Sequence, residues 1–133
     1  MSTVADLMTA NVVSVHPDTP LLKVQNLLRK HGFRHLVVVE NDILKGVLSN
    51  RDVLQALSPF LNTSAETQRD VRTLSRPASE LMNTSPRTVT PDTSVNDAAR
   101  LLLDHAISAL PVEKDGVLQG IITTKDVLRH YTA

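Results

Sequence analysis

The stretch GVLSNRD, residues 46–52, has a near copy in GIITTKD, residues 120–126. Both read glycine, two apolar residues, a hydroxyl residue, two further residues and aspartate. A shift of 74 residues aligns 4–57 with 78–131 without a gap. One register kept over this length indicates an internal duplication, so we expect two similar halves.

The first part of each repeat predicts a short helical turn, a strand and a long helix. The turns are ADLM and SELM, and the short strands are expected at 12–15 and 87–89. Thr19 followed by Pro20 is typical of a helix start, so the first long helix is predicted over 20–31. Apolar spacing predicts the buried faces of the two equivalent helices. These faces comprise Leu21, Val24, Leu27 and Leu28 in one helix and Val95, Ala98, Leu101 and Leu102 in the other.

The second part of each repeat predicts a hairpin and a closing helix. Residues 35–40 form a nearly continuous apolar strand, and the dipeptides ND at 41–42 and DG at 115–116 indicate hairpin turns. The strands ILKGVLS and VLQGIIT follow, and helices are expected to begin near Asn50 and Thr124. The predicted order is therefore β-α-β-β-α, twice, which is an α/β fold.

The segment between the repeats has no counterpart after the second repeat. It contains no glycine, so it does not have the composition of a flexible linker. Thr63 and Glu66 have the spacing of a capping box, and Leu61, Val71 and Leu74 could then lie on a short helix.

Composition excludes several classes of partner. Lys plus Arg equals Asp plus Glu, at 14 each, so the chain has no overall field that would gather nucleic acid or anionic membrane. The three aromatic residues, Phe33, Phe60 and Tyr131, give no stacking platform for single strands. There is no cysteine, and no apolar run approaches a membrane span. We expect no nucleic-acid partner, no membrane insertion and a cytoplasmic location.

The duplicated motif has two interpretations. Ser49 with Asp52, and Thr123 with Asp126, fit a capping box that needs no ligand. Alternatively, a helix N-terminus attracts phosphate, and an aspartate one turn later can accept hydrogen bonds from ribose hydroxyls. A lysine or arginine beside each aspartate is not needed for a cap but suits a ribose-phosphate ligand. The residues alone leave both interpretations open.

Other chemistry is not indicated. His31 and His35 are separated by an expected helix end, and no set of histidines and carboxylates has metal-ligand spacing. The chain has neither a phosphate-binding P-loop, a dinucleotide-binding glycine motif nor a nucleophile elbow. Asp52 and Asp126 are symmetry copies, which gives no reason for the different pKa values of an acid-base pair. We expect no enzyme activity, no metal site and no catalytic cofactor.

Taken together, the chain resembles a tandem pair of CBS domains, a Bateman module, of the kind found in stand-alone CBS-domain-containing proteins. The resemblance rests on LM near the start of each repeat, V-x-P-D-T, RHLVVVE, SALPVEKDGVLQG and the two final motifs. It implies two β-α-β-β-α repeats packed sheet to sheet with pseudo-two-fold symmetry. The repeats would span 1–57 and 78–133, with a partly helical segment over 58–77.

The resemblance also implies an adenosine-containing ligand in clefts between the repeats. AMP, ADP or ATP would be the regulatory ligand, with S-adenosylmethionine or NAD(H) as further candidates. Asp52 and Asp126 would hold the ribose hydroxyls. The other residues implied are Ser49 and Thr123 at the phosphate end with Arg51 and Lys125 nearby; Val13, Arg87, 33–36 and Ile107, Ser108, Ala109 and Leu110 around the adenine; and Arg34 and His35 at phosphates of a ligand in the facing site.

The two implied sites are not equivalent. The second repeat has the family's more common SALPV and DG, whereas the first has RHLVV and ND, with Val37 in place of the proline. We therefore expect the Asp126 site to bind more readily than the Asp52 site. The resemblance implies a regulatory module, a homodimer and an unknown effector protein. The alternative is a non-binding dimerisation or docking scaffold with degenerate sites.

Overall fold

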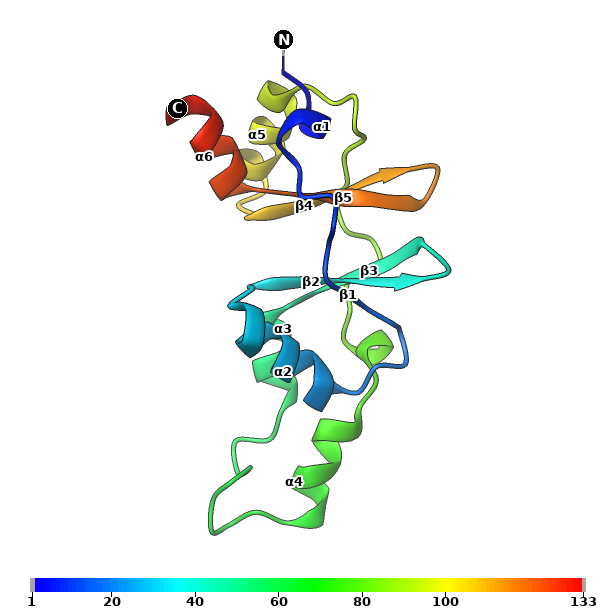
Figure 1. The fold of residues 1–133 in the computed structure, drawn as a ribbon. Coiled ribbons are helices and arrows are strands. Elements are labelled where there is room, and N and C mark those ends of the chain that lie inside the picture. Colours follow the sequence, from blue (N-terminus) through cyan, green and yellow to red (C-terminus); the bar gives the residue numbers. More distant parts are fainter. Residues whose placement is uncertain (1, 133) are drawn as a thin grey trace. The chain divides into compact units, whose positions relative to one another are not determined.

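The computed structural model describes residues 2–132 and has the α/β architecture that the sequence predicts (Figure 1). The elements follow in the order α1 (Val4–Leu7), β1 (Ser14–Val15), α2 (Leu21–His31), β2 (His35–Glu40), β3 (Ile43–Ser49), α3 (Asn50–Ala56), α4 (Gln68–Arg72), the 3₁₀ turns η1 (Thr73–Ser75) and η2 (Ala78–Glu80), α5 (Val95–Asp104), β4 (Ala109–Lys114), β5 (Val117–Thr123) and α6 (Thr124–Thr132). The order of strands and long helices confirms the β-α-β-β-α prediction for the first repeat, although its first strand is limited to Ser14–Val15. The strand predicted at 87–89 is wrong, because only an isolated bridge between Val89 and Val112 forms there, so the second repeat has the order α-β-β-α.

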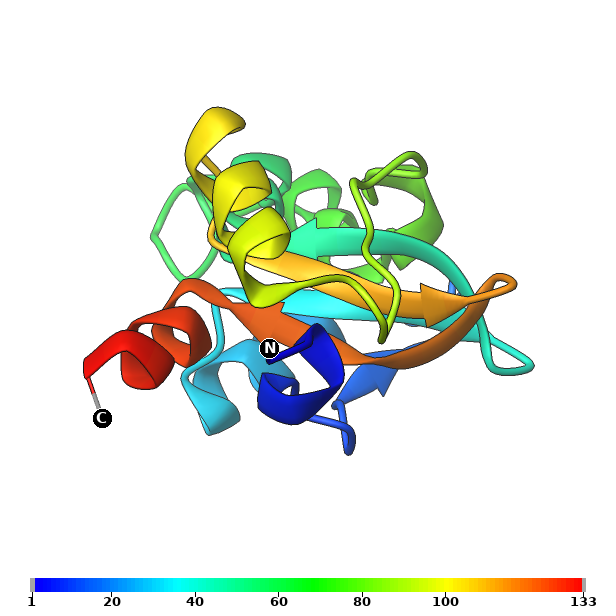
Figure 2. The ribbon, with the colours of Figure 1, turned by 90° about the horizontal axis from the view of Figure 1, so that it is seen from above.

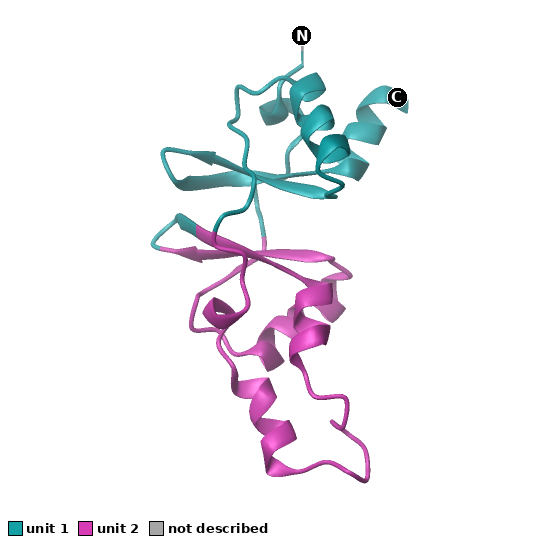
Figure 3. Cartoon of the chain, turned by 180° about the vertical axis from the view of Figure 1, so that it is seen from behind, with its two compact units in different colours: residues 1–12, 41–44, 85–133 teal, residues 13–40, 45–84 magenta. Residues whose placement is uncertain are grey.

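The chain forms two compact units that do not coincide with the sequence repeats (Figure 3). Unit 1 comprises residues 1–12, 41–44 and 85–133, and unit 2 comprises residues 13–40 and 45–84. Each unit therefore combines most of one sequence repeat with the first segment of the other repeat.

Unit 1 is built on the antiparallel hairpin of β4 and β5. Its turn has positive φ at Asp115 (54°) and Gly116 (84°), which matches the hairpin turn predicted for the DG dipeptide. Helices α1, α5 and α6 lie on one face of this hairpin (Figures 1 and 2). The core beneath them consists of Val4, Val89, Val95, Ala98, Leu102, Leu110, Val112, Ile122 and Val127.

Unit 2 places the parallel pair of β1 and β2 beside β3. Its core consists of Val15, Leu21, Val24, Leu28, Leu36, Val38, Leu48, Val53 and Ala78. The apolar faces predicted for α2 and α5 are confirmed, because Leu21, Val24 and Leu28 are buried in one helix and the equivalent residues are buried in the other. The ND turn is also confirmed, with positive φ at Asn41 (52°) and Asp42 (66°).

The predicted start of α2 is wrong by one residue. Pro20 is the N-cap and the helix begins at Leu21. The hydroxyl of Thr19 accepts instead from the backbone N–H of His16 at 3.0 Å. The first helical N–H, that of Leu21, donates to the backbone oxygen of Arg76 at 2.9 Å. A partner from a distant part of the chain therefore replaces the local cap.

The capping box predicted at Thr63 and Glu66 is also wrong. The Thr63 hydroxyl donates to the backbone oxygen of Phe60 at 2.6 Å, and no helix begins there. The box forms at Thr67 and Asp70 and starts α4. The Ser58 hydroxyl also donates to Asp70 at 2.6 Å, and this bond is the main cause that lowers the pKa of Asp70.

The glycine of each duplicated motif lies against the LM segment of the other sequence repeat. A Cβ on Gly120 would lie 2.6 Å from the Thr9 backbone oxygen, and a Cβ on Gly46 would lie 2.8 Å from the Asn83 backbone oxygen. The adjacent methionine, Met8 or Met82, completes each contact. The Gly120 contact lies within unit 1 and the Gly46 contact lies within unit 2. Glycine is required at both positions because another stretch of backbone approaches too closely for a Cβ.

Candidate functional site

The Ser/Thr-x-x-Asp motif forms a capping box in both units. In unit 2, the Ser49 N–H donates to Asp52 Oδ2 at 3.1 Å and the Asp52 N–H donates to Ser49 Oγ at 3.0 Å. In unit 1, the Thr123 N–H donates to Asp126 Oδ2 at 2.9 Å and the Asp126 N–H donates to Thr123 Oγ1 at 3.3 Å. The capping interpretation is therefore confirmed. A box engages one oxygen of each aspartate, so it is compatible with a ligand on the other.

The start of each closing helix is tied to the loop before the first strand of the hairpin, β4 in unit 1 and β2 in unit 2. The Thr124 N–H donates to the backbone oxygen of Ser108 at 2.9 Å, and the Asn50 N–H donates to the backbone oxygen of Arg34 at 2.8 Å. These bonds occupy equivalent positions. Each unit therefore brings its implied adenine-reading loop next to its implied ribose and phosphate residues.

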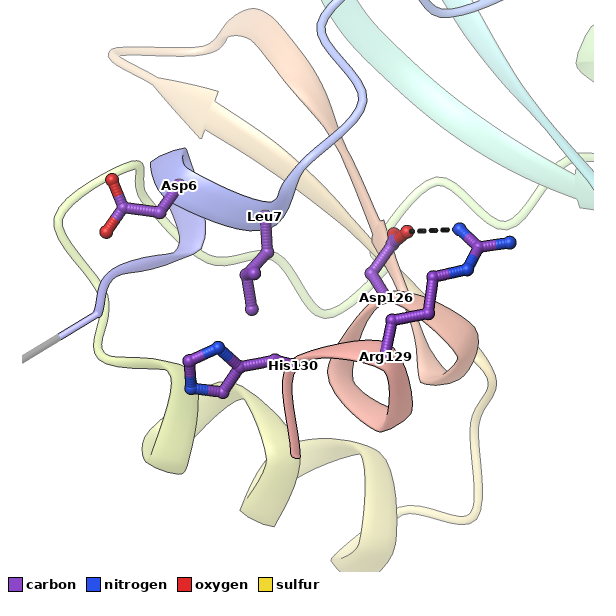
Figure 4. A pocket seen from close by; sticks show the side chains of 5 residues that line it. All are labelled: Asp6, Leu7, Asp126, Arg129 and His130. Carbon is purple, nitrogen blue, oxygen red and sulfur yellow. Dashed lines mark ion pairs between the residues drawn. The ribbon is translucent and has the colours of Figure 1, made fainter. Parts of the chain in front are cut away.

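In unit 1, Asp126 borders a surface hollow of about 380 Å³. The lining residues are Asp6 and Leu7 from α1, with Asp126, Arg129 and His130 from α6 (Figure 4). Arg129 lies one turn after Asp126, and its guanidinium nitrogen is 3.6 Å from Asp126 Oδ1. The hollow is thus lined by two carboxylates, a guanidinium, an imidazole and the apolar Leu7.

In unit 2, the corresponding aspartate lies near a histidine. His35, at the start of β2, is half-buried. Burial is the main cause that lowers its pKa, and the Arg34 charge acts in the same direction, whereas the Asp52 carboxylate opposes them. His35 and Asp52 are thus close enough to interact electrostatically.

The remaining predicted residues are more dispersed. Lys125 and Arg51 are exposed in the first turns of α6 and α3. Arg87 is exposed in unit 1 and does not line the hollow. Val13 packs, partly buried, against the core of unit 2. Ile107 packs against the core of unit 1, while Ala109 and Leu110 begin β4.

Four residues of the hollow were missed by the sequence analysis. Arg129 could have been found, because a residue three positions after Asp126 lies on the same helix face. His130 follows it directly. No sequence pattern pointed to Asp6 and Leu7. They belong to the first sequence repeat, and they lie next to α6 because the segment that begins each repeat packs in the unit that holds most of the other repeat.

Among residues 2–132, no group of three or more histidine, cysteine, aspartate or glutamate residues is arranged to hold a metal ion. Within the same residues, no helix combines the length and the apolar character that a membrane span needs.

The two units share a capping box, a loop bonded to the start of the closing helix, and a glycine packed against the LM segment of the other repeat. This duplicated architecture has a known counterpart. The CBS domain family matches the chain twice, over residues 4–59 and 78–133. The chain belongs to the CBS domain family. The tandem CBS pair expected from the sequence is thereby confirmed.

Two curated relatives match nearly the whole chain. It is 35% identical to the CBS domain-containing protein YhcV of Bacillus subtilis, over 96% of this chain and 84% of YhcV. It is 28% identical to hypoxic response protein 1 of Mycobacterium tuberculosis, over 98% of this chain and 85% of that protein.

Solved CBS structures share the fold. A structure described as CBSX2 in complex with AMP is 33% identical, with a TM-score of 0.84, and the match covers 99% of this chain and 97% of CBSX2. A structure of CBSX2 from Arabidopsis thaliana is 31% identical, with a TM-score of 0.78, over 98% of this chain and 94% of that chain.

Proposed function

We propose that this CBS pair is a non-catalytic regulatory module that binds an adenosine-containing ligand at the Asp126 site and signals its occupancy to a separate protein. The observation that carries the proposal is the similarity to CBSX2, whose structure contains AMP, over nearly the full length of both chains. AMP, ADP and ATP are the first candidate ligands, and S-adenosylmethionine and NAD(H) share the adenosine group.

The geometry of α6 supports a ribose at Asp126. Its Oδ2 accepts from the Thr123 N–H and hydroxyl, whereas Oδ1 makes, among residues 2–132, only the ion pair with Arg129. An ionised carboxylate offers about four lone-pair positions, so two remain for ribose hydroxyls. The N-terminus of α6 and the exposed Lys125 favour a phosphate nearby.

The adjacent loop supports an adenine on the same side of the helix start. Its Ser108 oxygen already holds the Thr124 N–H at 2.9 Å, which fixes the loop relative to α6. Ser108 and Ala109 are half-buried rather than fully covered, so part of this segment stays accessible. Ligand contact with both the loop and the helix would stabilise the shape that binds, which is the basis of a population shift.

Thermal unfolding with AMP, ADP, ATP, S-adenosylmethionine and NADH tests the proposal. A ligand at about 100 times its dissociation constant adds about 2.7 kcal/mol to the free energy of unfolding. Asp126→Asn should abolish the shift. Asp70→Asn is the matched control, because Asp70 occupies the same capping position in α4 and has no ligand role.

The outcomes separate the alternatives. A shift that persists in Asp70→Asn and disappears in Asp126→Asn supports the ribose site. A shift that survives Asp126→Asn moves the site elsewhere, with Asp52 as the next candidate. No shift with any of the five ligands would contradict the proposal and favour a non-binding dimerisation or docking scaffold.

We further propose that the module is a cytoplasmic homodimer, since the cytoplasm supplies free adenine nucleotides. Leu54 in α3 and Leu128 in α6 occupy equivalent positions and are 57% and 56% exposed. Large apolar side chains exposed at the same place in both repeats suit a self-complementary interface. Sedimentation of Leu54→Glu and Leu128→Glu should show the loss of a dimer; an unchanged dimer would place the interface elsewhere.

A further inference from the structure

The two oxygens of the Asp126 carboxylate have different partners. Oδ2 accepts from the Thr123 N–H at 2.9 Å and from the Thr123 hydroxyl at 3.0 Å. Oδ1 lies 3.6 Å from the guanidinium of Arg129 (Figure 4). The Asp126 side chain is 13% exposed, whereas that of Arg129 is 77% exposed. The oxygen that the cap leaves for a ligand is therefore already paired with a cation at the surface.

Unit 2 has the same cap without this cation. The position equivalent to Arg129 is Gln55, three residues after Asp52. Within residues 2–132, Asp52 has no ion pair within 4.0 Å. The duplication thus offers a natural comparison between a carboxylate with a counter-ion and one without.

A ribose bound at Oδ1 must share that oxygen with Arg129 or displace the guanidinium. A neutral nucleoside gives the displaced cation nothing in return. A ligand with a phosphate offers oxygens to a side chain that is long, exposed and rich in N–H donors. Arg129 is also the only lysine or arginine among the five described residues that line the hollow, and the carboxylates of Asp6 and Asp126 lie in the same lining. Without Arg129 the lining would therefore disfavour an anionic ligand.

We infer that Arg129 is a specificity-determining residue that makes the Asp126 site prefer anionic adenosine ligands, such as nucleotides, over neutral nucleosides. The inference rests on the proposed function of the same site. It assigns Arg129 a role in choosing the ligand, whereas the family resemblance assigns roles only to the motif residues and the loops. Unit 2 has the uncharged Gln55 at the equivalent position, so its site should discriminate less between nucleotides and nucleosides.

Calorimetric titration of AMP and adenosine tests the inference in an Asp52→Asn background, which removes the unit 2 carboxylate. Arg129→Gln installs the residue that unit 2 has at this position. It should reduce the preference for AMP over adenosine by about twofold to fivefold, the range expected of an exposed charge pair. Raising the salt should reduce the preference of the parent protein more than that of Arg129→Gln, because exposed charges are screened.

Two further variants exclude a structural explanation. Arg129→Lys keeps the charge and should retain most of the preference for AMP. Gln55→Arg, in an Asp126→Asn background, should raise the preference for AMP at unit 2. Circular dichroism checks that each variant is folded.

Three outcomes are distinguishable. A reduced AMP preference in Arg129→Gln, retained in Arg129→Lys, supports the inference. Equal changes in both affinities, or none, overturn it while the proposed function stands. If the parent protein binds neither AMP nor adenosine, the proposed function fails at this site and the inference fails with it.

Discussion

Units 1 and 2 share a frame and differ at the positions around one aspartate. Both have a glycine against an exchanged LM segment, a capping box, and a loop bonded to the start of the closing helix. The differences are Arg129 and His130 opposite Gln55 and Ala56, and Ser108 and Ala109 opposite Arg34 and His35. The two units therefore share the contacts that hold the motif in place and the aspartate itself, while the side chains around that aspartate differ.

The largest expected effect comes from the shared frame. Gly46→Ala and Gly120→Ala each place a methyl group under 3.0 Å from a backbone oxygen. Backbone cannot yield as a flexible side chain does, so each should lower the free energy of unfolding by about 1–3 kcal/mol. Urea denaturation measures the loss.

Each glycine variant is the control for the other. Amide hydrogen exchange should show faster exchange around Met8 and Thr9 in Gly120→Ala, and around Met82 and Asn83 in Gly46→Ala. Normal stability in either variant would mean that the LM segment does not pack on that glycine.

The capping boxes come next and sharpen the comparison. Ser49→Ala and Thr123→Ala should each lower the free energy of unfolding by about 1 kcal/mol. Thr123→Ala should have the larger effect, because the Thr123 hydroxyl both accepts from the Asp126 N–H and donates to its carboxylate. The same denaturation experiment decides this, with Thr123→Ser as a conservative control. A larger loss in Ser49→Ala would contradict the assigned bonds.

The smallest expected effect concerns pH and only unit 2. Burial holds the pKa of His35 below 6.5 in the folded protein, so the unfolded chain binds the proton more readily. Stability from this group is present above pH 6.5 and declines as the pH falls from there towards the folded pKa. His35→Ala installs the residue that unit 1 has at the equivalent position, Ala109, and should flatten this part of the pH profile. An unchanged profile would mean that His35 is not the group responsible.

Much of the fold could be predicted because its signals are local. The helix face of Leu21, Val24 and Leu28 and the ND and DG turns could be predicted because each depends on residues only a few positions apart. The start of α2 could not be predicted, since the Leu21 N–H finds its partner in Arg76, far along the chain. The box at Thr67 was missed because Thr63 with Glu66 has the same spacing pattern and only the surrounding chain decides between them.

The candidate site was predictable in its motif residues and not in its surroundings. The sequence could pair Ser49 with Asp52 and Thr123 with Asp126, because a capping box joins two residues that are three positions apart. Asp6 and Leu7 line the hollow because residues 1–12 pack in unit 1, and the spacing of apolar residues does not predict that packing. Their place beside Asp126 depends on where the chain crosses from one unit to the other.

The central claim is that the Asp126 site of unit 1 binds an adenosine ligand. Amide hydrogen exchange of the protein with and without AMP tests it most directly, because the two units give separate peptides. We predict slower exchange at 107–110 and 123–130 on AMP addition, and no such change in Asp126→Asn. Unchanged exchange in these segments at saturating AMP, or a change confined to unit 2, would contradict the claim.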